Sequence, residues 1–151
     1  MIIVNSEHIG NTRSLTGQSV YRKLPFMSKH YISNKGMIDP IKTPHGEIVY
    51  ELIGSTDEHG SAEGHSLAYV RIPPGKNSLA HYHTRSEESY YILEGEAILI
   101  VDGSSYLMTP GDTCLILPGQ VHQIFNNSPR NLDFLAVCVP PWESSDSVYI
   151  D

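Results

Sequence analysis

The sequence predicts an all-β fold, a sandwich or barrel of roughly seven or eight short strands. Three observations lead to this prediction. From residue 47 onward, short apolar runs alternate with turn residues such as glycine and proline. Almost no segment keeps the 3.6-residue apolar period of a helix over several turns. The chain has 151 residues, 40% of them hydrophobic and 18% charged, which is enough to bury the core of one globular domain.

The strands can be placed in chain order from their apolar runs and the turn residues between them. The candidates are 47–54, 66–72, 89–95, 96–101, 112–117, 121–125 and 132–139. Between the fourth and fifth candidates, Asp102-Gly103 predicts a tight hairpin, because glycine accepts the positive φ of a type I′ turn. Pro140-Pro141 ends the last strand, because proline cannot donate a hydrogen bond to a sheet.

Three parts of the chain differ in pattern. Residues 1–44 are expected to be an N-terminal arm that packs on the barrel or on a second subunit, 45–140 the barrel, and 141–151 a C-terminal tail. No run approaches the roughly 18 apolar residues of a membrane helix. The first residues also lack the basic start of a signal peptide. We therefore expect a cytoplasmic location and no membrane partner.

Net charge and cysteine content narrow the function classes. The formal charge is −7, from 17 acids against 10 lysines and arginines. Nucleic-acid binding usually needs a basic surface, so we expect a small-molecule partner and no nucleic acid. Cys114 and Cys138 both lie in apolar β-like runs. We interpret them as buried free thiols rather than a disulfide framework.

A group of histidines and one acid is the strongest functional signal. His81 and His83 are one residue apart in a run expected to be a strand, so their side chains point to the same side. Glu88 follows shortly afterwards, and His122 comes later in the chain. One such histidine pair among the eight histidines of the sequence could arise by chance. Three imidazoles and a carboxylate at one point would make a metal site with nitrogen and oxygen ligands.

With its flanking glycines, this pattern resembles the cupin superfamily. The first cupin motif, G(X)5HXH(X)3,4E(X)6G, is matched by Gly75, His81, His83, Glu88 and Gly95. Glu87 would suit the shorter spacer, but six residues would then no longer separate the acid from the final glycine, so we assign Glu88. The second motif, G(X)5PXG(X)2H(X)3N, is matched by Gly111, Gly119, His122 and Asn126. Leu117 stands where the family has proline, at a turn position that carries no ligand atom.

The resemblance implies a double-stranded β-helix, that is, a jelly-roll cupin barrel, with His81, His83, Glu88 and His122 as metal ligands. Three histidines and a glutamate suit an octahedral divalent transition metal with about two open positions. Fe or Mn is the first choice, and Zn or Ni is possible. Open positions are what metal-dependent catalysis requires.

Strand alternation orients the neighbours of the ligands. If Glu88 points inward, Tyr90 and Ile92 also point inward and Tyr91 points out. Tyr90 would then lie beside the metal as a candidate catalytic residue that binds substrate or moves a proton, or as an aromatic that only packs. Asn126 is expected to fix the backbone near a turn.

The roles of three other side chains stay open at this stage. Tyr69 or Arg71 could line the cavity, because the phase of their strand is not fixed by the pattern. Trp142, after the paired prolines, could cap a barrel end or an interface.

The resemblance implies a metal-dependent enzyme acting on a small polar molecule by dioxygenase, lyase or isomerase chemistry. The alternative is a non-catalytic cupin that binds or senses a small molecule. A purely structural barrel would leave the inward-facing histidines and glutamate without a reason, because buried ionisable groups are costly unless paired or metal-bound. A homodimer is expected from the family and from sheet edges that need cover.

Overall fold

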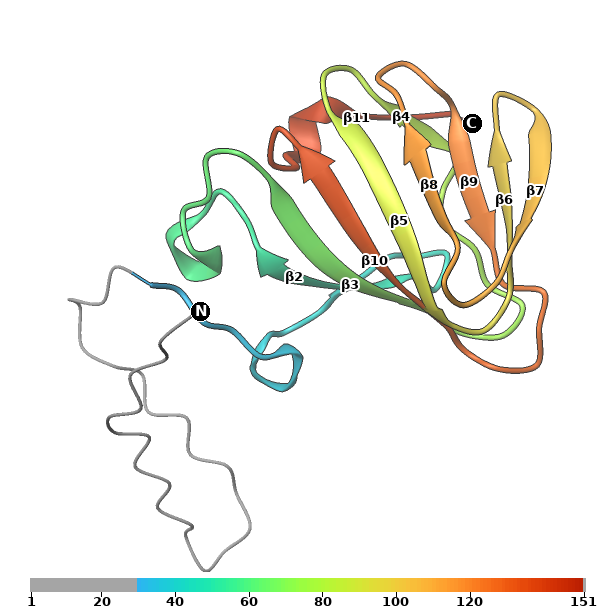
Figure 1. Ribbon diagram of the computed structural model, residues 1–151, viewed down its shortest axis with the longest axis horizontal. Helices are drawn as coiled ribbons and strands as arrows, with labels where there is room; N and C mark the ends of the chain where they lie inside the picture. The colour runs from blue at the N-terminus through green and yellow to red at the C-terminus, as the bar shows by residue number, and fades with distance from the viewer. Residues whose placement is uncertain (1–29, 151) are drawn as a thin grey trace, which may run out of the picture. The chain divides into compact units, whose positions relative to one another are not determined.

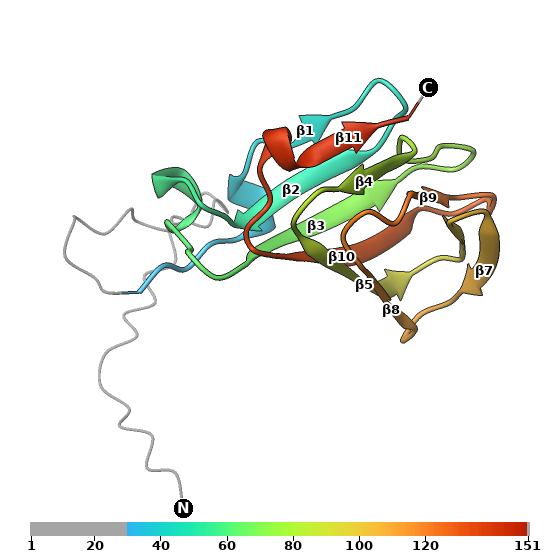
Figure 2. The same cartoon turned by 90° about the horizontal axis from the view of Figure 1, so that it is seen from above.

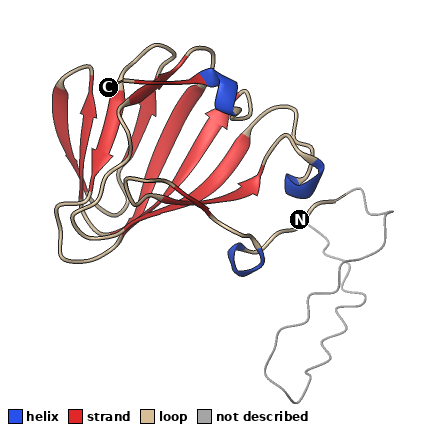
Figure 3. Ribbon diagram, turned by 180° about the vertical axis from the view of Figure 1, so that it is seen from behind, coloured by secondary structure: helices blue, strands red, loops and turns tan. Residues whose placement is uncertain are grey.

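In the computed structural model, residues 30–150 are described, and they form two antiparallel β-sheets (Figure 1). The strands are β1 Ile41–Lys42, β2 Ile48–Ile53, β3 Ser66–Ile72, β4 His81–His83, β5 Glu87–Glu94, β6 Ala97–Val101, β7 Ser104–Met108, β8 Thr113–Ile116, β9 His122–Phe125, β10 Leu132–Val139 and β11 Ser147–Tyr149. Three short 3-10 turns complete the secondary structure of this part: η1 Lys35–Met37, η2 Asp57–His59 and η3 Ser144–Asp146 (Figure 3).

The order of the strands is that of a jelly roll. One sheet runs β1-β2-β3-β10-β5-β8 and the other β11-β4-β9-β6-β7. Neighbours such as β3 and β10 are far apart in sequence, so the chain crosses repeatedly between the two sheets (Figure 2). The all-β prediction and the double-stranded β-helix implied by the resemblance are confirmed.

Most predicted strands are found within two residues of their expected bounds. The segments 66–72 and 132–139 are strands β3 and β10 with the same ends. The predicted hairpin joins β6 to β7, and Asp102 and Gly103 have φ of 49° and 80°, as a type I′ turn requires. This hairpin brings the edge strand β7 back alongside β6.

Side-chain alternation builds the core between the sheets. On β5, Tyr90 is 4% exposed and Ile92 is fully buried, whereas Tyr91 between them is 47% exposed. The predicted facing of all three is confirmed. Phe134 on β10 packs against Tyr90 with ring centroids 4.8 Å apart. The apolar core therefore continues directly into the wall of the site described below.

Short strands at both ends of the barrel segment were not expected from the pattern. β1 pairs with β2, and β11 pairs with β4 in the register Ser147↔His83. The predicted tail, 141–151, thus contributes a strand to the second sheet. Most of the predicted arm, 1–44, lies outside the described residues. Between residues 30 and 150, the structure contains no helix long and apolar enough to cross a bilayer.

Candidate metal centre

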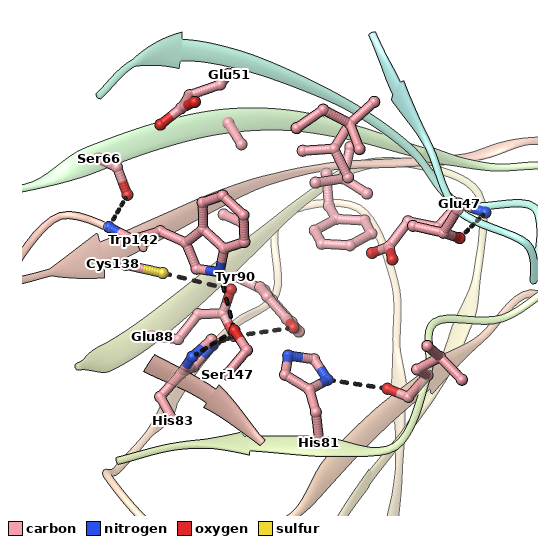
Figure 4. Close-up of a pocket in the computed structure, with 18 of the residues that line it drawn as sticks. Glu47, Glu51, Ser66, His81, His83, Glu88, Tyr90, Cys138, Trp142 and Ser147 are labelled. Carbon is pink, nitrogen blue, oxygen red and sulfur yellow. Dashed lines mark hydrogen bonds and ion pairs between the residues drawn. The ribbon is translucent and has the colours of Figure 1, made fainter. Parts of the chain in front are cut away.

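The four predicted ligands come together at one end of the cavity between the sheets. His81 and His83 come from β4, Glu88 from β5 and His122 from β9. Each offers one donor atom, and these four atoms all lie within 4.8 Å of one another. Glu88, His83 and His122 are buried, and His81 is partly exposed on the cavity side (Figure 4). The group can therefore hold a metal ion.

The Glu88 carboxylate lies at the centre of the cluster. Its Oε2 is 3.2 Å from Nε2 of His83 and 3.0 Å from Nε2 of His122. Burial opposes the ionised form of Glu88, but the hydrogen bonds to His122 and His83 outweigh it and hold its pKa well below the usual range. The carboxylate is therefore ionised and ready to act as a ligand.

Backbone carbonyls orient two of the imidazoles. Nδ1 of His81 is 2.9 Å from the carbonyl oxygen of Leu79, and Nδ1 of His122 is 3.0 Å from that of Gln120. A carbonyl only accepts, so each Nδ1 carries a hydrogen and each Nε2 is left to face the cluster. Burial, then the neighbouring His122, lowers the pKa of His81 to about 4, which keeps that imidazole neutral. His122 differs, because burial would lower its pKa but the hydrogen bond to Glu88 outweighs burial and raises it; a bound metal would replace the proton on its Nε2. Imidazole Nε2 atoms and a carboxylate fit a divalent transition metal.

The third imidazole is held by the C-terminal segment. Nδ1 of His83 lies 3.3 Å from Oγ of Ser147, and the Trp142 indole donates to the same oxygen at 3.0 Å (Figure 4). Ser147 reaches this place because β11 pairs with β4. The tail therefore orients a predicted metal ligand.

A buried carboxylate fixes the start of β11. Asp146 is 1% exposed and accepts hydrogen bonds from the Thr84 hydroxyl at 2.5 Å and from the backbone amides of Arg85 and Ser86 at 2.9 and 3.1 Å. These donors belong to the loop between β4 and β5, which carry three of the four ligands. We refer to this arrangement as the Asp146 clamp.

Beside the cluster lies a cavity of about 180 Å³ with mainly apolar walls. The Tyr90 hydroxyl donates to Oε2 of Glu88 at 3.1 Å, and the Cys138 thiol lies 3.6 Å from Oε1. Burial and the nearby Glu88 raise the pKa of Tyr90 well above its usual value, so the phenol keeps its proton. Cys138 is buried, as expected, but it also contacts a predicted ligand.

Strand phase decides which of the side chains left open by the sequence pattern face the cavity. Ala68 and Val70 of β3 line the cavity, whereas Tyr69 and Arg71 point away from it, and both contact the carboxylate of Asp133. Trp142 lines the cavity.

Asn126 fixes the backbone near a turn, as predicted. Its amide nitrogen donates to the carbonyl oxygens of Ile72 at 2.8 Å and Arg130 at 2.7 Å. The residue therefore closes a turn and lies outside the cavity wall.

The cavity residues that the sequence reasoning missed include Glu47 and Ser147. Glu47 precedes a strand whose inward positions include another acid, Glu51, so the usual polar-out pattern is reversed there. Ser147 stands in a segment with no apolar alternation. Neither carries a signal that spacing alone could have shown.

The chain is similar to cupins in sequence and in structure. Residues 68–138 match the family model described as Cupin domain. An uncharacterised protein of Methanocaldococcus jannaschii is 34% identical over 114 residues, which cover 76% of this chain and 90% of the relative.

Two solved structures extend the similarity. A predicted oxalate decarboxylase of Thermotoga maritima is 26% identical with a TM-score of 0.64, covering 74% of this chain and 99% of that one. The formate complex of Lactobacillus farciminis oxalate decarboxylase is 27% identical with a TM-score of 0.66. That match covers 76% of this chain but only 34% of the enzyme, so this chain spans about a third of its length.

Proposed function

The chain belongs to the cupin family, and from this premise we propose that it is a metal-dependent enzyme acting on a small polar molecule. His81, His83, Glu88 and His122 would hold one divalent transition metal, with Fe or Mn as first choice. The observation that carries the proposal is the convergence of four donor atoms within 4.8 Å, three of them from residues that line the cavity. Four protein ligands leave about two positions of an octahedral ion for substrate or oxygen.

Catalysis of the dioxygenase, lyase or isomerase type is supported by this arrangement. When bound, the metal would supply a Lewis acid that polarises a substrate oxygen. Tyr90 is proposed as the catalytic residue, because its protonated hydroxyl lies at the cavity wall 3.1 Å from Glu88. Similarity to oxalate decarboxylases makes small organic acids the first substrates to test.

Metal content tests the ligand assignment. Protein purified without chelator should contain about one transition metal per chain by elemental analysis, and His83→Ala should lose most of it. His45→Ala is the control, because His45 is an exposed histidine outside the cluster. Wild-type protein without metal, even after reconstitution with Fe or Mn, would refute the metal site.

A panel of small hydroxy, keto and dicarboxylic acids tests the chemistry. CO2 release and oxygen consumption would be followed with the Fe- and Mn-loaded protein. Tyr90→Phe should retain the metal and lose turnover, whereas Tyr91→Phe, an exposed neighbour, should change neither. Full turnover by Tyr90→Phe would show that Tyr90 only packs against the core and takes no part in catalysis. Binding of panel members without any turnover would identify the non-catalytic alternative.

We also propose that the protein is a homodimer. Tyr91 and Leu93 of β5 and Leu115 of β8 are 47%, 40% and 58% exposed on one face of adjacent strands, a suitable surface for a second copy. Light scattering should give twice the chain mass, and Leu115→Glu should shift it to the monomer.

A further inference from the structure

A second carboxylate faces the cavity beside the metal cluster. Glu47 is the residue before β2, and its side chain points into the space lined by Tyr90 and His81 (Figure 4). It lies outside the segment 68–138 that matches the family model.

The carboxylate of Glu47 has no hydrogen-bond donor among the described residues. The contrast is Glu51, two inward positions further along β2, whose carboxylate lies 3.2 Å from Nδ1 of His59. No buried side-chain oxygen or nitrogen of the described residues lacks a partner, so the Glu47 oxygens are open to water in the cavity. A ligand that brings a donor would replace this water with a charge-assisted hydrogen bond.

The residues of the cavity wall indicate the charge of the ligand group that would bind Glu47. No lysine or arginine of the described part of the chain lines the cavity, and the wall includes aromatic rings. The aromatic residues that line it are Tyr90, Phe134, Trp142 and Tyr149. Carboxylate and aromatic faces together favour a protonated amine, and a second carboxylate on the ligand would meet Glu47 with like charge.

We propose that Glu47 binds the end of the substrate opposite to its metal-binding oxygen. This end carries a hydrogen-bond donor, and a protonated amine is favoured over a hydroxyl. The inference rests on the proposed metal site, because the metal would hold the other end. It selects one class among small polar molecules: those with an oxygen ligand at one end and a donor at the other.

The electrostatics of the cavity agree with this role. Burial, and then the charge of Glu88, raises the pKa of Glu47 to about 7. A bound ammonium group would favour the ionised carboxylate.

A matched ligand series tests the inference on the full-length, Mn-loaded protein. Butyrate, γ-hydroxybutyrate, γ-aminobutyrate and succinate share one carboxylate and differ only at the far end. Isothermal titration calorimetry should rank γ-aminobutyrate first, on the order of tenfold tighter than butyrate, from one charge-assisted hydrogen bond. Succinate should bind more weakly than γ-aminobutyrate.

Two variants test whether Glu47 causes the preference for γ-aminobutyrate. Glu47→Gln keeps the shape of the side chain and should reduce the preference for γ-aminobutyrate over butyrate to about twofold or less. Glu51→Gln is the matched control, because this carboxylate is already paired with His59, and it should retain the preference. Retention of the preference in a folded Glu47→Gln protein would overturn the assignment.

The wild-type series gives a result that needs no variant. Metal-loaded protein that binds butyrate or succinate at least as tightly as γ-aminobutyrate would overturn the inference and leave the metal site intact. Protein that takes up no metal would refute the proposed function itself. Metal content measured on the same samples separates the two failures.

Discussion

Replacing Asp146 with alanine should destabilise the protein by about 3 to 5 kcal/mol, because this buried carboxylate accepts three hydrogen bonds. Asp146 is 1% exposed and joins η3 to the loop between β4 and β5. Its loss would leave the buried amide of Ser86 without an acceptor and would free the start of β11. The clamp therefore stabilises both the fold and the position of Ser147.

The magnitude follows from the three hydrogen bonds of the clamp. A hydrogen bond to a charged group contributes about 1.5 to 3 kcal/mol net, and bonds that share one carboxylate do not add fully. The ion pair of Asp146 with Arg85 adds little, because the arginine side chain is 58% exposed and the Nε–Oδ1 distance is 3.5 Å. Asp146→Asn keeps an acceptor oxygen and should lose roughly half as much as alanine.

Urea unfolding followed by circular dichroism would measure the loss, with Asp39→Ala as the control because Asp39 is exposed. The dependence on pH has a defined sign. Burial would raise the pKa of Asp146, but its hydrogen bonds with Thr84 and Ser86 lower it overall. The ionised group therefore stabilises the fold above the unfolded pKa of about 3.9, and this contribution is lost as pH falls toward the folded pKa.

The difference in stability between wild type and Asp146→Asn should accordingly be largest near neutral pH and should shrink in acid. A loss below about 1 kcal/mol for Asp146→Ala at neutral pH would contradict the clamp, because that is the scale of an ordinary surface substitution. A difference that grows toward pH 3 would contradict the depressed pKa.

Two other predictions concern the Ser147 hydroxyl and the turn at Gly95. Ser147→Ala should weaken metal affinity by about 10- to 100-fold in a chelator competition titration, because His83 loses the partner of its Nδ1; unchanged affinity would exclude this orienting role. Gly95→Ala should cost more than about 2 kcal/mol in urea unfolding, because a Cβ at this position, with φ of +85°, would lie 2.5 Å from the carbonyl oxygen of Asn131. Gly103→Ala is its control, with φ of +80° but no atom within 4 Å of an added Cβ, and it should cost only about 1 kcal/mol.

The candidate metal site could be predicted from the sequence because its geometry is mostly local. His81 and His83 share a face by strand alternation, and Glu88 follows after a spacer that allows a turn. Only His122 requires a long-range contact, and the second motif supplied it through the family resemblance. The inward facing of Tyr90 followed from that of Glu88 by the same alternation.

Strand phase could not be predicted where both faces of a strand carry mixed residues. On β3, Tyr69 and Arg71 turned out to face away from the cavity, toward Asp133 of the neighbouring β10. The choice depends on which face the second sheet covers, and this is a property of the assembled fold. Glu47 was missed for the same reason, since an acid beside an apolar strand is normally expected to face solvent.

By itself, the sequence determined the all-β class, the order of the main strands and the four side chains that can hold a metal. The class and the strand order follow from short-range periodicity and turn residues, and the ligand set follows from the motif spacing together with the family resemblance. Only the tertiary structure showed that the C-terminal segment pairs with β4, that Ser147 and the Asp146 clamp support the site, and that Glu47 faces the cavity. β11 is three residues long and carries no period, so it exists as a strand because β4 offers unpaired backbone groups at the edge of the sheet.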